Sequence, residues 1–382
     1  MRVLFTANPL LGHWLPMLPL ARAALAAGHE VVVAAGPDVV PDLERRGFLA
    51  WSIGPTVETI HTNVGQRPRE PAETEAERQV ADGLAMFADP AVDRARDVQR
   101  LTARWQPDIV VQELYELGGS FVPAPLHVFH GLGTHYPGFV GLVDLALTRI
   151  SATLGPPAWL TPITETVYVD PFPAALQPPE DQPFLEVMPI RPAAGEVGAD
   201  DALPESVLRL SGPTVYLSFG TLFGSVDVFA DALAALQALP VDVVLTCGLR
   251  VDPAAFGPLP GRVVVERYVP QALLLPRCSA VVCHAGAGTL IGALAHGLPL
   301  VCLPQGADQF GNAQQVARVG AGITLSPGQS TPEAIRAAVD AVLTDPSYAS
   351  AARSLQAQIA QLPEPTAVMT ALVARANGRD AS

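Results

Sequence analysis

Short apolar runs rich in β-branched residues alternate with helical segments along most of the chain. In the first half, Val3 to Thr6 and Val31 to Ala34 read as buried strands, and the apolar spacing from Trp14 to Ala27 predicts a helix between them. The second half repeats the pattern, with strand-like runs at 214–218, 241–246, 262–265, 280–283 and 300–303. Strands that alternate with helices predict an α/β protein made of two doubly wound, Rossmann-like domains that face a cleft.

The turn after the run at 280–283 carries groups that suit an anion. It reads His284-Ala285-Gly286-Ala287-Gly288-Thr289 and leads into a predicted helix that ends near His296. Glycines let the backbone approach a ligand closely, and the N–H groups of a first helical turn bind negative charge, so a diphosphate fits here. Ordinary helix capping explains a lone Gly-x-Gly equally well.

Polar residues also follow two other predicted strands. Tyr268-Val269-Pro270-Gln271 comes after the strand at 262–265, and Gln305-Gly306-Ala307-Asp308-Gln309 follows the strand at 300–303. Strand ends in a parallel sheet share one edge, where ligands usually bind. Asp308 and Gln309 combine an acceptor with a donor and suit the hydroxyls of a hexose, although Asp308 is also suited to cap the next helix.

In the first half, the turn from Asn8 to Pro16 places His13 at the carboxyl end of the first strand. A histidine there can take a proton from a hydroxyl at neutral pH, as a general base must. A histidine that only satisfies turn carbonyls is the alternative. Glu113 ends the strand at 107–113, where it can reach His13 across neighbouring strand ends or be a solvated loop acid.

The segment after Glu113 is short. Leu117 to Val122 leaves few residues before the next strand, Leu126 to Phe129, whereas a parallel crossover needs about a dozen. The connection is therefore either a single turn or differently wired, which leaves the geometry around Glu113 open. In the Gly-rich turn that follows, His130 and Tyr136 are expected either to line a ligand pocket at the same edge or to serve packing.

Length and proline content divide the chain. With 382 residues it suits two domains. The stretch from Pro171 to Pro204 is rich in proline, and few core contacts are expected to cross such a segment. We therefore predict domains at 1–190 and 205–362, a linker at 191–204, and a last helix at 363–382 after the break Pro363-Glu364-Pro365.

Charge and cysteine usage exclude several classes of partner. The formal net charge of -14 argues against nucleic acid and anionic membranes, which are bound through basic patches. All 23 basic residues are arginine, which excludes a P-loop lysine. The four cysteines fit core thiols in a reducing, cytoplasmic setting, and no run reads as a signal peptide or membrane span. Small-molecule partners are expected, and a homodimer is left open.

Together the motifs resemble the nucleotide-sugar signature of bacterial natural-product glycosyltransferases of the GT-B fold, which are related to plant small-molecule glycosyltransferases. The match consists of the Val269-Pro270-Gln271 turn, His284-x-Gly-x-Gly-Thr289, the Gly-x-Pro at 297–299, and Ala307-Asp308-Gln309 with Asn312 three residues on. Gly12-His13-x-x-Pro16 matches the turn that carries the catalytic base in that family. The resemblance covers the C-terminal half and returns at the N-terminus.

The resemblance implies a role for each of these positions. His13 is the base and Glu113 its partner, and the N-terminal domain binds the acceptor through Trp14, His130 and Tyr136. The C-terminal domain binds the nucleotide-sugar donor, and the terminal helix crosses back onto the first domain. The implied donor-binding residues are Ser218, Gly220, Thr221, Tyr268, Val269, Gln271, His284, Gly286, Gly288, Thr289, Asp308 and Gln309.

One departure from the family bears on the donor. Relatives that use UDP-sugars commonly have a glutamate eight residues after the phosphate histidine, where it accepts hydrogen bonds from the ribose hydroxyls, and here that residue is Gly292. This favours a dTDP-hexose as co-substrate, with a UDP-hexose as the alternative.

The expected reaction is inverting transfer of a hexose or deoxyhexose to the hydroxyl of a small-molecule aglycone in antibiotic or other natural-product biosynthesis. No cofactor or metal is expected, since the sequence has no Asp-x-Asp and no His or Cys cluster with metal-ligand spacing. A sugar-nucleotide epimerase of the same fold and a non-catalytic auxiliary protein of a glycosyltransferase are the alternatives.

Overall fold

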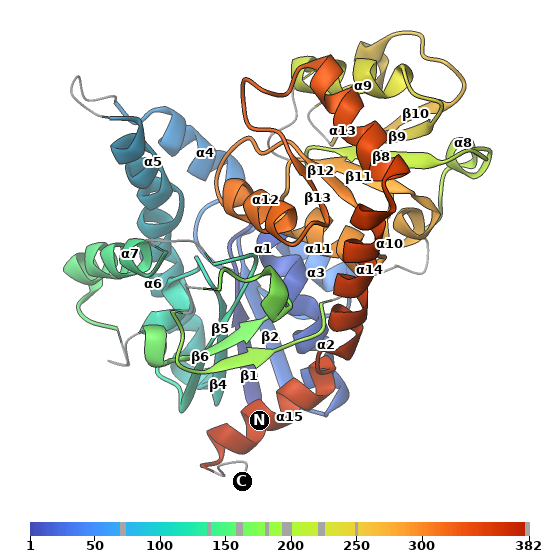
Figure 1. Ribbon diagram of the computed structural model, residues 1–382. Coiled ribbons are helices and arrows are strands. Elements are labelled where there is room, and N and C mark those ends of the chain that lie inside the picture. Colours follow the sequence, from blue (N-terminus) through green and yellow to red (C-terminus); the bar gives the residue numbers. More distant parts are fainter. Residues whose placement is uncertain are drawn as a thin grey trace.

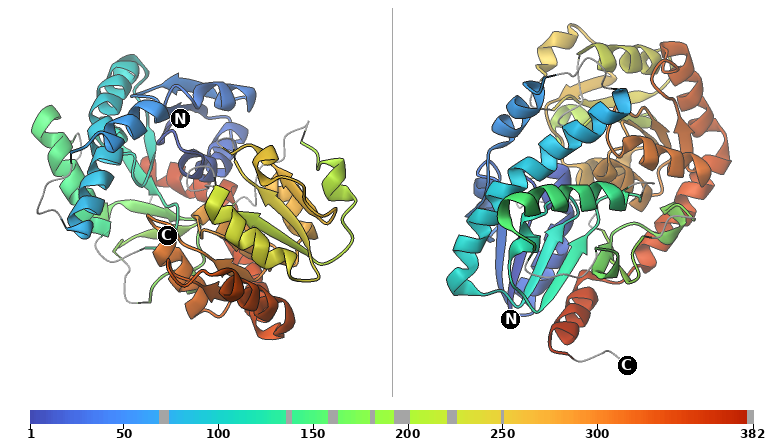
Figure 2. Two further views of the ribbon diagram at one scale, coloured as in Figure 1. Left: turned by 90° about the horizontal axis from the view of Figure 1, so that it is seen from above. Right: turned by 90° about the vertical axis from the view of Figure 1, so that its left-hand side faces the viewer.

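The computed structural model describes residues 1–68, 74–135, 139–157, 163–179, 183–192, 201–220, 226–248 and 251–378. Two parallel sheets, each covered by helices, form two α/β halves that pack against each other (Figure 1). The perpendicular views of Figure 2 show the same two halves. The predicted fold class, two doubly wound α/β domains, is confirmed.

The first sheet has seven strands in the order β3-β2-β1-β4-β5-β6-β7, and every neighbouring pair is parallel. Its central strands are short apolar runs that are buried on both faces, as expected where helices cover both sides of a sheet. The strands are β1 Arg2–Thr6, β2 Glu30–Ala35, β3 Leu49–Ser52, β4 Ile109–Glu113, β5 Leu126–His130, β6 Val167–Asp170 and β7 Val187–Pro189.

The single helix expected from Trp14 to Ala27 is divided into three pieces. Pro16 and Pro19 lie in the first turns of the second and third pieces, where the missing N–H of proline costs nothing. The helices and helical turns of this half are α1 Leu11–Trp14, η1 Leu15–Met17, α2 Leu18–Ala26, α3 Val40–Arg45, α4 Val57–Gly65, α5 Glu75–Gly83, the π-helical turn η2 Leu84–Ala88, α6 Asp89–Trp105, η3 Gly118–Phe121, α7 Phe139–Leu154, η4 Ile163–Glu165 and η5 Ala174–Leu176.

The short connection after Glu113 is a single 3₁₀ turn, η3. Strands β4 and β5 still pair in parallel, with Glu113 opposite His130. The single-turn alternative is therefore confirmed, and Glu113 keeps its place at the end of a central strand.

The second sheet has six strands in the order β10-β9-β8-β11-β12-β13, again all parallel. The strands are β8 Thr214–Ser218, β9 Asp242–Thr246, β10 Val263–Glu266, β11 Ala280–Cys283, β12 Leu300–Cys302 and β13 Gly322–Thr324. The helices and helical turns of this half are α8 Glu205–Leu208, α9 Val226–Gln237, η6 Pro253–Phe256, α10 Gln271–Leu274, η7 Leu275–Arg277, α11 Ala287–Ala295, α12 Gln309–Arg318, α13 Pro332–Thr344, α14 Pro346–Gln361 and α15 Pro365–Ala376.

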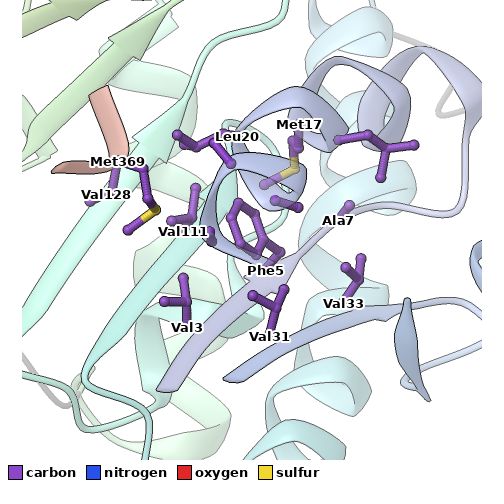
Figure 3. Packing of buried hydrophobic residues seen from close by; sticks show 14 of the residues in the cluster. Val3, Phe5, Ala7, Met17, Leu20, Val31, Val33, Val111, Val128 and Met369 are labelled. Atoms are coloured by element: carbon purple, nitrogen blue, oxygen red, sulfur yellow. The ribbon is translucent and has the colours of Figure 1, made fainter. Parts of the chain in front are cut away.

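The last helix, α15, belongs to the core of the first half. Val368, Met369 and Leu372 are buried in the same cluster as the side chains of β1 and α2. Figure 3 shows Met369 beside Val128, with Val111 between Met369 and the ring of Phe5. Arg375 of α15 also pairs with Glu186, just before β7.

The proline-rich segment contributes more side chains to the hydrophobic cores than its composition predicts. Phe172 and Leu176 are buried among residues of β8, β11 and α11, within the second half. A few residues later, β7 returns to the first sheet as its edge strand, a position that tolerates proline. The expectation that few core contacts cross this segment is wrong, because the apolar residues between the prolines are free to pack.

In both sheets the strand order reverses at one point, and ligands of doubly wound proteins bind at such points. The reversal lies between β1 and β4 in the first sheet and between β8 and β11 in the second. His13 and Glu113 follow or end the first pair of strands, and Gly220 and His284 follow the second pair. The topology therefore brings the candidate residues of each half to a single edge.

Candidate active site

His13 and Glu113 form a close pair at the reversal point of the first sheet. His13 lies in α1, directly after the turn that follows β1, and Glu113 is the last residue of the adjacent strand β4. His13 Nδ1 lies 3.0 Å from Glu113 Oε2, and the side chain of His13 is 15% exposed while that of Glu113 is fully buried. Only the imidazole of the pair therefore reaches solvent.

Glu113 is held from three sides. The Asn8 side-chain amide donates to Oε2 at 2.7 Å, and the Tyr115 backbone N–H donates to Oε1 at 2.7 Å. Burial raises the pKa of the Glu113 carboxyl, but the His13 imidazole and these hydrogen bonds outweigh it, so the pKa lies below its ordinary value. An ionised Glu113 accepts from Nδ1–H of His13, which leaves Nε2 as the proton-accepting nitrogen.

Asn8 was not singled out from the sequence as a functional residue. Its only sequence signal is its place at the end of β1 in the same turn as His13. The structure shows it as the residue that ties that turn to Glu113.

Two aromatic rings flank the imidazole. The centroid of Phe87, in the π-helical turn η2, lies 5.7 Å from that of His13, and Tyr115 lies at 6.2 Å. Phe87 and Tyr115 are stacked on each other with centroids 5.1 Å apart. His13 is therefore bordered by apolar surface on the side of α5 and α6.

In the second half, the ring of His284 is held between two glycines. A Cβ at Gly220 would lie 2.9 Å from Cε1 and Nε2 of His284, and one at Gly286 would lie 2.4 Å from Nε2. Gly220 also has a φ of +70°, which disfavours any side chain. Burial lowers the pKa of His284 to about 4, although a hydrogen bond with the Ser218 backbone raises it. His284 is thus a neutral imidazole at the point where α11 begins.

Hydroxyl and amide groups link the ends of β8, β9, α10 and α11. Gln271 Nε2 donates to Tyr216 Oη at 3.1 Å and to Thr289 Oγ1 at 3.2 Å. Ser218 Oγ accepts from Thr246 Oγ1 at 3.1 Å and from the Gly220 N–H at 3.3 Å. Ser218, Gln271 and Thr289 therefore form one connected layer behind the glycine turns.

Asp308 and Gln309 lie at the start of α12. Asp308 makes no side-chain capping hydrogen bond, and its Oδ2 accepts from Asn312 Nδ2 at 2.8 Å instead. Burial raises the pKa of Asp308, and the Asn312 bond and the nearby His13 lower it in part. Gln309 is buried, and its Oε1 accepts from the N–H groups of Gln305 and Gly306. Helix capping therefore does not explain Asp308.

Asn312 joins the two halves. Its Oδ1 accepts from the backbone N–H of Thr134 at 3.0 Å and from Thr134 Oγ1 at 2.9 Å. Its Nδ2 donates to the Ala285 carbonyl at 3.1 Å as well as to Asp308. Ala285 has a φ of +62°, a costly conformation for alanine, and the Asn312 bond helps to fix it. One buried amide thus connects the turn after β5, the glycine turn and Asp308.

Comparison with known proteins shows which family this chain resembles. Residues 230–375 match the C-terminal domain of erythromycin biosynthesis protein CIII-like proteins. The chain is 31% identical to L-demethylnoviosyl transferase of Streptomyces niveus, over 98% of both chains. It is 32% identical to elloramycin glycosyltransferase ElmGT of Streptomyces olivaceus, over 97% of both chains. The chain belongs to the GT-B glycosyltransferases of antibiotic biosynthesis.

A solved structure of the spinosyn rhamnosyltransferase SpnG, complexed with thymidine diphosphate, superposes on this glycosyltransferase with a TM-score of 0.78 at 27% identity, covering 98% of this chain and 100% of the other. The named relatives are transferases. The resemblance expected from the sequence and the prediction of a hexosyltransferase are therefore confirmed.

Other predicted residues of the glycosyltransferase have varied surroundings. Trp14 and His130 are buried, Trp14 within the core of the first half, so packing accounts for both, and their contact with an acceptor stays a prediction.

Tyr268 is 64% exposed, whereas Val269 beside it is buried. Gly288 lies in the first turn of α11, with nothing within 4 Å of an added Cβ. Tyr136 and Thr221 lie outside the described residues.

Neither a metal cluster nor a membrane span occurs in the described part of the glycosyltransferase. No three His, Cys, Asp or Glu side chains gather there as a metal site requires. None of the helices described is both long and apolar enough to cross a bilayer.

Four buried groups predict how stability depends on pH. Burial lowers the pKa of His127, His130 and His284 to about 4 and raises that of Asp170 to about 7. Between about pH 4 and 6.5, each of the three imidazoles gains a proton on unfolding, whereas the Asp170 carboxyl loses its proton. The free energy of unfolding is therefore expected to fall as the pH drops below 6.5, by about 1 to 3 kcal/mol for each unit, because the raised pKa of Asp308 offsets part of the contribution of the imidazoles.

Urea unfolding followed between pH 7 and 5 measures this slope. His127→Gln, which removes a buried imidazole of β5, is expected to flatten it by about one proton's share, or about 1.4 kcal/mol per pH unit. An unfolding free energy that does not change over this range would contradict the prediction.

Proposed function

We propose that this glycosyltransferase transfers a hexose or deoxyhexose from a dTDP-sugar to a hydroxyl group of a small-molecule aglycone, with inversion and without a metal ion. The observation that carries the proposal is the placement of two groups across the two halves. The imidazole of His13 is oriented by buried Glu113. Asp308 accepts a hydrogen bond from Asn312, which is bonded to Thr134 of the first half, and the charge of His13 also lowers the pKa of Asp308. A base from one half and a sugar-binding carboxyl from the other thus serve one space.

The reaction follows from these groups. Nε2 of His13 accepts the proton of the acceptor hydroxyl while the oxygen of that hydroxyl forms a bond to the anomeric carbon of the sugar. The bond from that carbon to the phosphate oxygen breaks, and the nucleoside diphosphate leaves with the electron pair. Attack from the side opposite the leaving group gives inversion.

The charge that develops on the leaving diphosphate would be met by the second half. The first N–H groups of α11, after Gly286, offer the positive end of a helix, and Thr289 adds a hydroxyl. Gly220 and Gly286 keep the backbone near His284 open to a close approach. These groups can take the place that a divalent cation has in other transferases, which supports the metal-independent reaction.

The dTDP-sugar is favoured by Gly292. In α11, a Cβ at this position would lie 3.3 Å from Leu275 Cδ1 and 3.7 Å from Gln271 Oε1, so an acidic side chain has little room there. A nucleotide without a 2′-hydroxyl needs no acceptor at this place. The thymidine diphosphate complex of SpnG supports the same choice. The free, mostly buried cysteines support a cytoplasmic location.

Release of nucleoside diphosphate tests the proposal. With dTDP-glucose and a panel of polycyclic phenols, release is expected only when an acceptor is present and to be unaffected by EDTA. UDP-glucose is expected to react at least about tenfold more slowly, the equivalent of about 1.4 kcal/mol. An equal rate with both donors would contradict the donor assignment, and loss of activity in EDTA would contradict the metal-free reaction.

A further inference from the structure

Helix α12 carries a row of polar side chains on one side. Asp308 directly precedes the helix, and Asn312, Gln315 and Arg318 follow at helical spacing. Asn312 and Gln315 are buried, and buried amides are costly unless they are hydrogen-bonded. This side of α12 therefore needs polar partners, and the segments that follow β5 and β6 supply them.

The turn after β5 lies directly against Asp308. A Cβ added at Gly133 would lie 3.1 Å from both Asp308 Oδ2 and Asn312 Oδ1, so the turn has no room for a side chain there. The next residue, Thr134, donates to Asn312 Oδ1 through its N–H at 3.0 Å and through its hydroxyl at 2.9 Å. A residue of the first half thus holds the amide that lies beside the candidate sugar-binding carboxylate.

The two bonds from Thr134 decide which way the amide of Asn312 faces. Two donors can pair only with the amide oxygen, so Oδ1 faces the first half and the hydrogens of Nδ2 face the second. One of them goes to Asp308 Oδ2 at 2.8 Å and the other to the Ala285 carbonyl at 3.1 Å. With the amide reversed, its NH₂ would face the donors of Thr134 and its oxygen would face the carboxylate. Thr134 therefore excludes the orientation that repels Asp308.

The turn that carries Thr134 is itself held in place. The N–H of the following residue, His135, donates to Gln177 Oε1 at 2.9 Å, and Gln177 Nε2 donates to Asp170 Oδ2 at the end of β6 at 2.9 Å. The Gln177 carbonyl also accepts from Arg318 of α12 at 3.0 Å. The turn is thus tied to the first sheet and, at a second point, to α12, so Thr134 keeps a fixed place relative to that helix.

We infer that Thr134 is a positioning residue for the donor sugar. Through Asn312 it orients the Asp308 carboxylate toward a hydroxyl of the hexose, while the same amide steadies the glycine turn at Ala285. The half that carries the base thereby sets the sugar contact made by the other half. The inference rests on the proposed transfer from a dTDP-sugar, and it adds a residue of the first half that acts on the affinity for the donor.

Kinetics of Thr134→Val test this role. Valine has nearly the shape of threonine and keeps the N–H bond to Asn312, but it loses the bond from the hydroxyl. The kcat/KM for dTDP-glucose is expected to fall about three- to tenfold, mainly through KM, which is the usual effect of one lost hydrogen bond. The Kd for dTDP, which lacks the hexose, is expected to change less than twofold.

Two further variants serve as controls. Thr134→Ser restores the hydroxyl, and its kcat/KM is expected to stay within twofold of the wild-type value. Thr102→Val is the matched control, because Thr102 is also buried in the first half but its hydroxyl donates to the Val98 carbonyl within α6. It is expected to leave both kcat/KM and the Kd for dTDP unchanged.

A double-mutant cycle distinguishes positioning from packing. If Thr134 acts through Asp308, Thr134→Val lowers kcat/KM no further once Asp308 is replaced by asparagine. Asn312→Asp, which cannot donate to Asp308, is expected to lower kcat/KM at least as much as Thr134→Val. The inference is overturned if the effects of Thr134→Val and Asp308→Asn multiply in the double variant, or if Thr134→Ser is as impaired as Thr134→Val.

Binding distinguishes a failure of this inference from a failure of the proposed function. If the wild-type chain releases no dTDP with any acceptor, the proposed transfer fails, and calorimetric titration with dTDP-glucose and with dTDP decides the role of Thr134. A Thr134→Val variant that binds dTDP-glucose at least threefold more weakly, with the Kd for dTDP unchanged, supports that role. Equal changes for the two ligands, or no change for either, overturn it.

Discussion

Replacement of His13 by alanine is expected to lower turnover with hydroxyl acceptors by about two to four orders of magnitude, the usual contribution of a positioned general base. The imidazole is the only part of the His13–Glu113 pair that reaches solvent. The groups expected to bind the nucleotide belong to the other half, so the Kd for dTDP is expected to change less than twofold. Initial rates of dTDP release and calorimetric titration with dTDP measure the two quantities.

His29→Ala is the matched control for this prediction. His29 lies in the same half, where its ring contacts the N-terminal amine of Met1, and it has no contact with Glu113. Its loss is expected to leave turnover unchanged. If His13→Ala keeps more than a tenth of the wild-type rate, another group must accept the proton and the mechanism proposed above is wrong.

Glu113→Gln is expected to lower turnover about as much as His13→Ala does, because it changes the protonation of the His13 ring. The two oxygens of Glu113 accept from Asn8, from Tyr115 and from the imidazole. A glutamine has one oxygen fewer and would turn its NH₂ toward Nδ1 of His13, which forces the proton onto Nε2, the nitrogen that has to act as base. We expect kcat to fall by about two to four orders of magnitude with KM for both substrates nearly constant.

Steady-state kinetics with both substrates varied distinguishes this from a packing defect. Asp108→Asn, just before the opposite end of the same strand, is the control, since the Asp108 carboxylate accepts from the backbone N–H of Arg2 at the start of β1. It is expected to leave kcat unchanged. A Glu113→Gln variant whose KM values rise while kcat stays constant would show that Glu113 shapes binding rather than the base.

Much of the fold could be predicted because the signals are local. The β-branched runs of β1, β2, β8 and β11 are bounded by turn residues, and the glycine turn at His284 directly precedes a helix. The short strands β7 and β13 gave no such signal. Gly322 in β13 packs so close to the Leu300 carbonyl that an added Cβ would lie 2.2 Å away, and this depends on the neighbouring strand rather than on local sequence.

The placement of the candidate residues was predictable where chemistry and strand position coincide, as for His13, Glu113 and His284 at the ends of central strands. It was not predictable where a role depends on contacts between distant segments. Asn312 entered the sequence analysis only as part of the matched motif, yet it bonds to Thr134 in the other half. The hydrogen bond that Arg94 donates to the Phe87 carbonyl has a weak signal, since Arg94 is a charged residue on the apolar face of α6 next to Ala91 and Ala95. It depends on a π-helical turn that sequence periodicity does not show.

The position of α15 limits how this enzyme can be recombined with its relatives. Val368, Met369 and Leu372 fill a gap between α2 and the first sheet, although they come from the far end of the chain. A hybrid made by a single junction near residue 205 would place one parent's tail against another parent's sheet. Exchange of the second half therefore calls for two junctions, with residues 363–378 kept from the parent that supplies the first half.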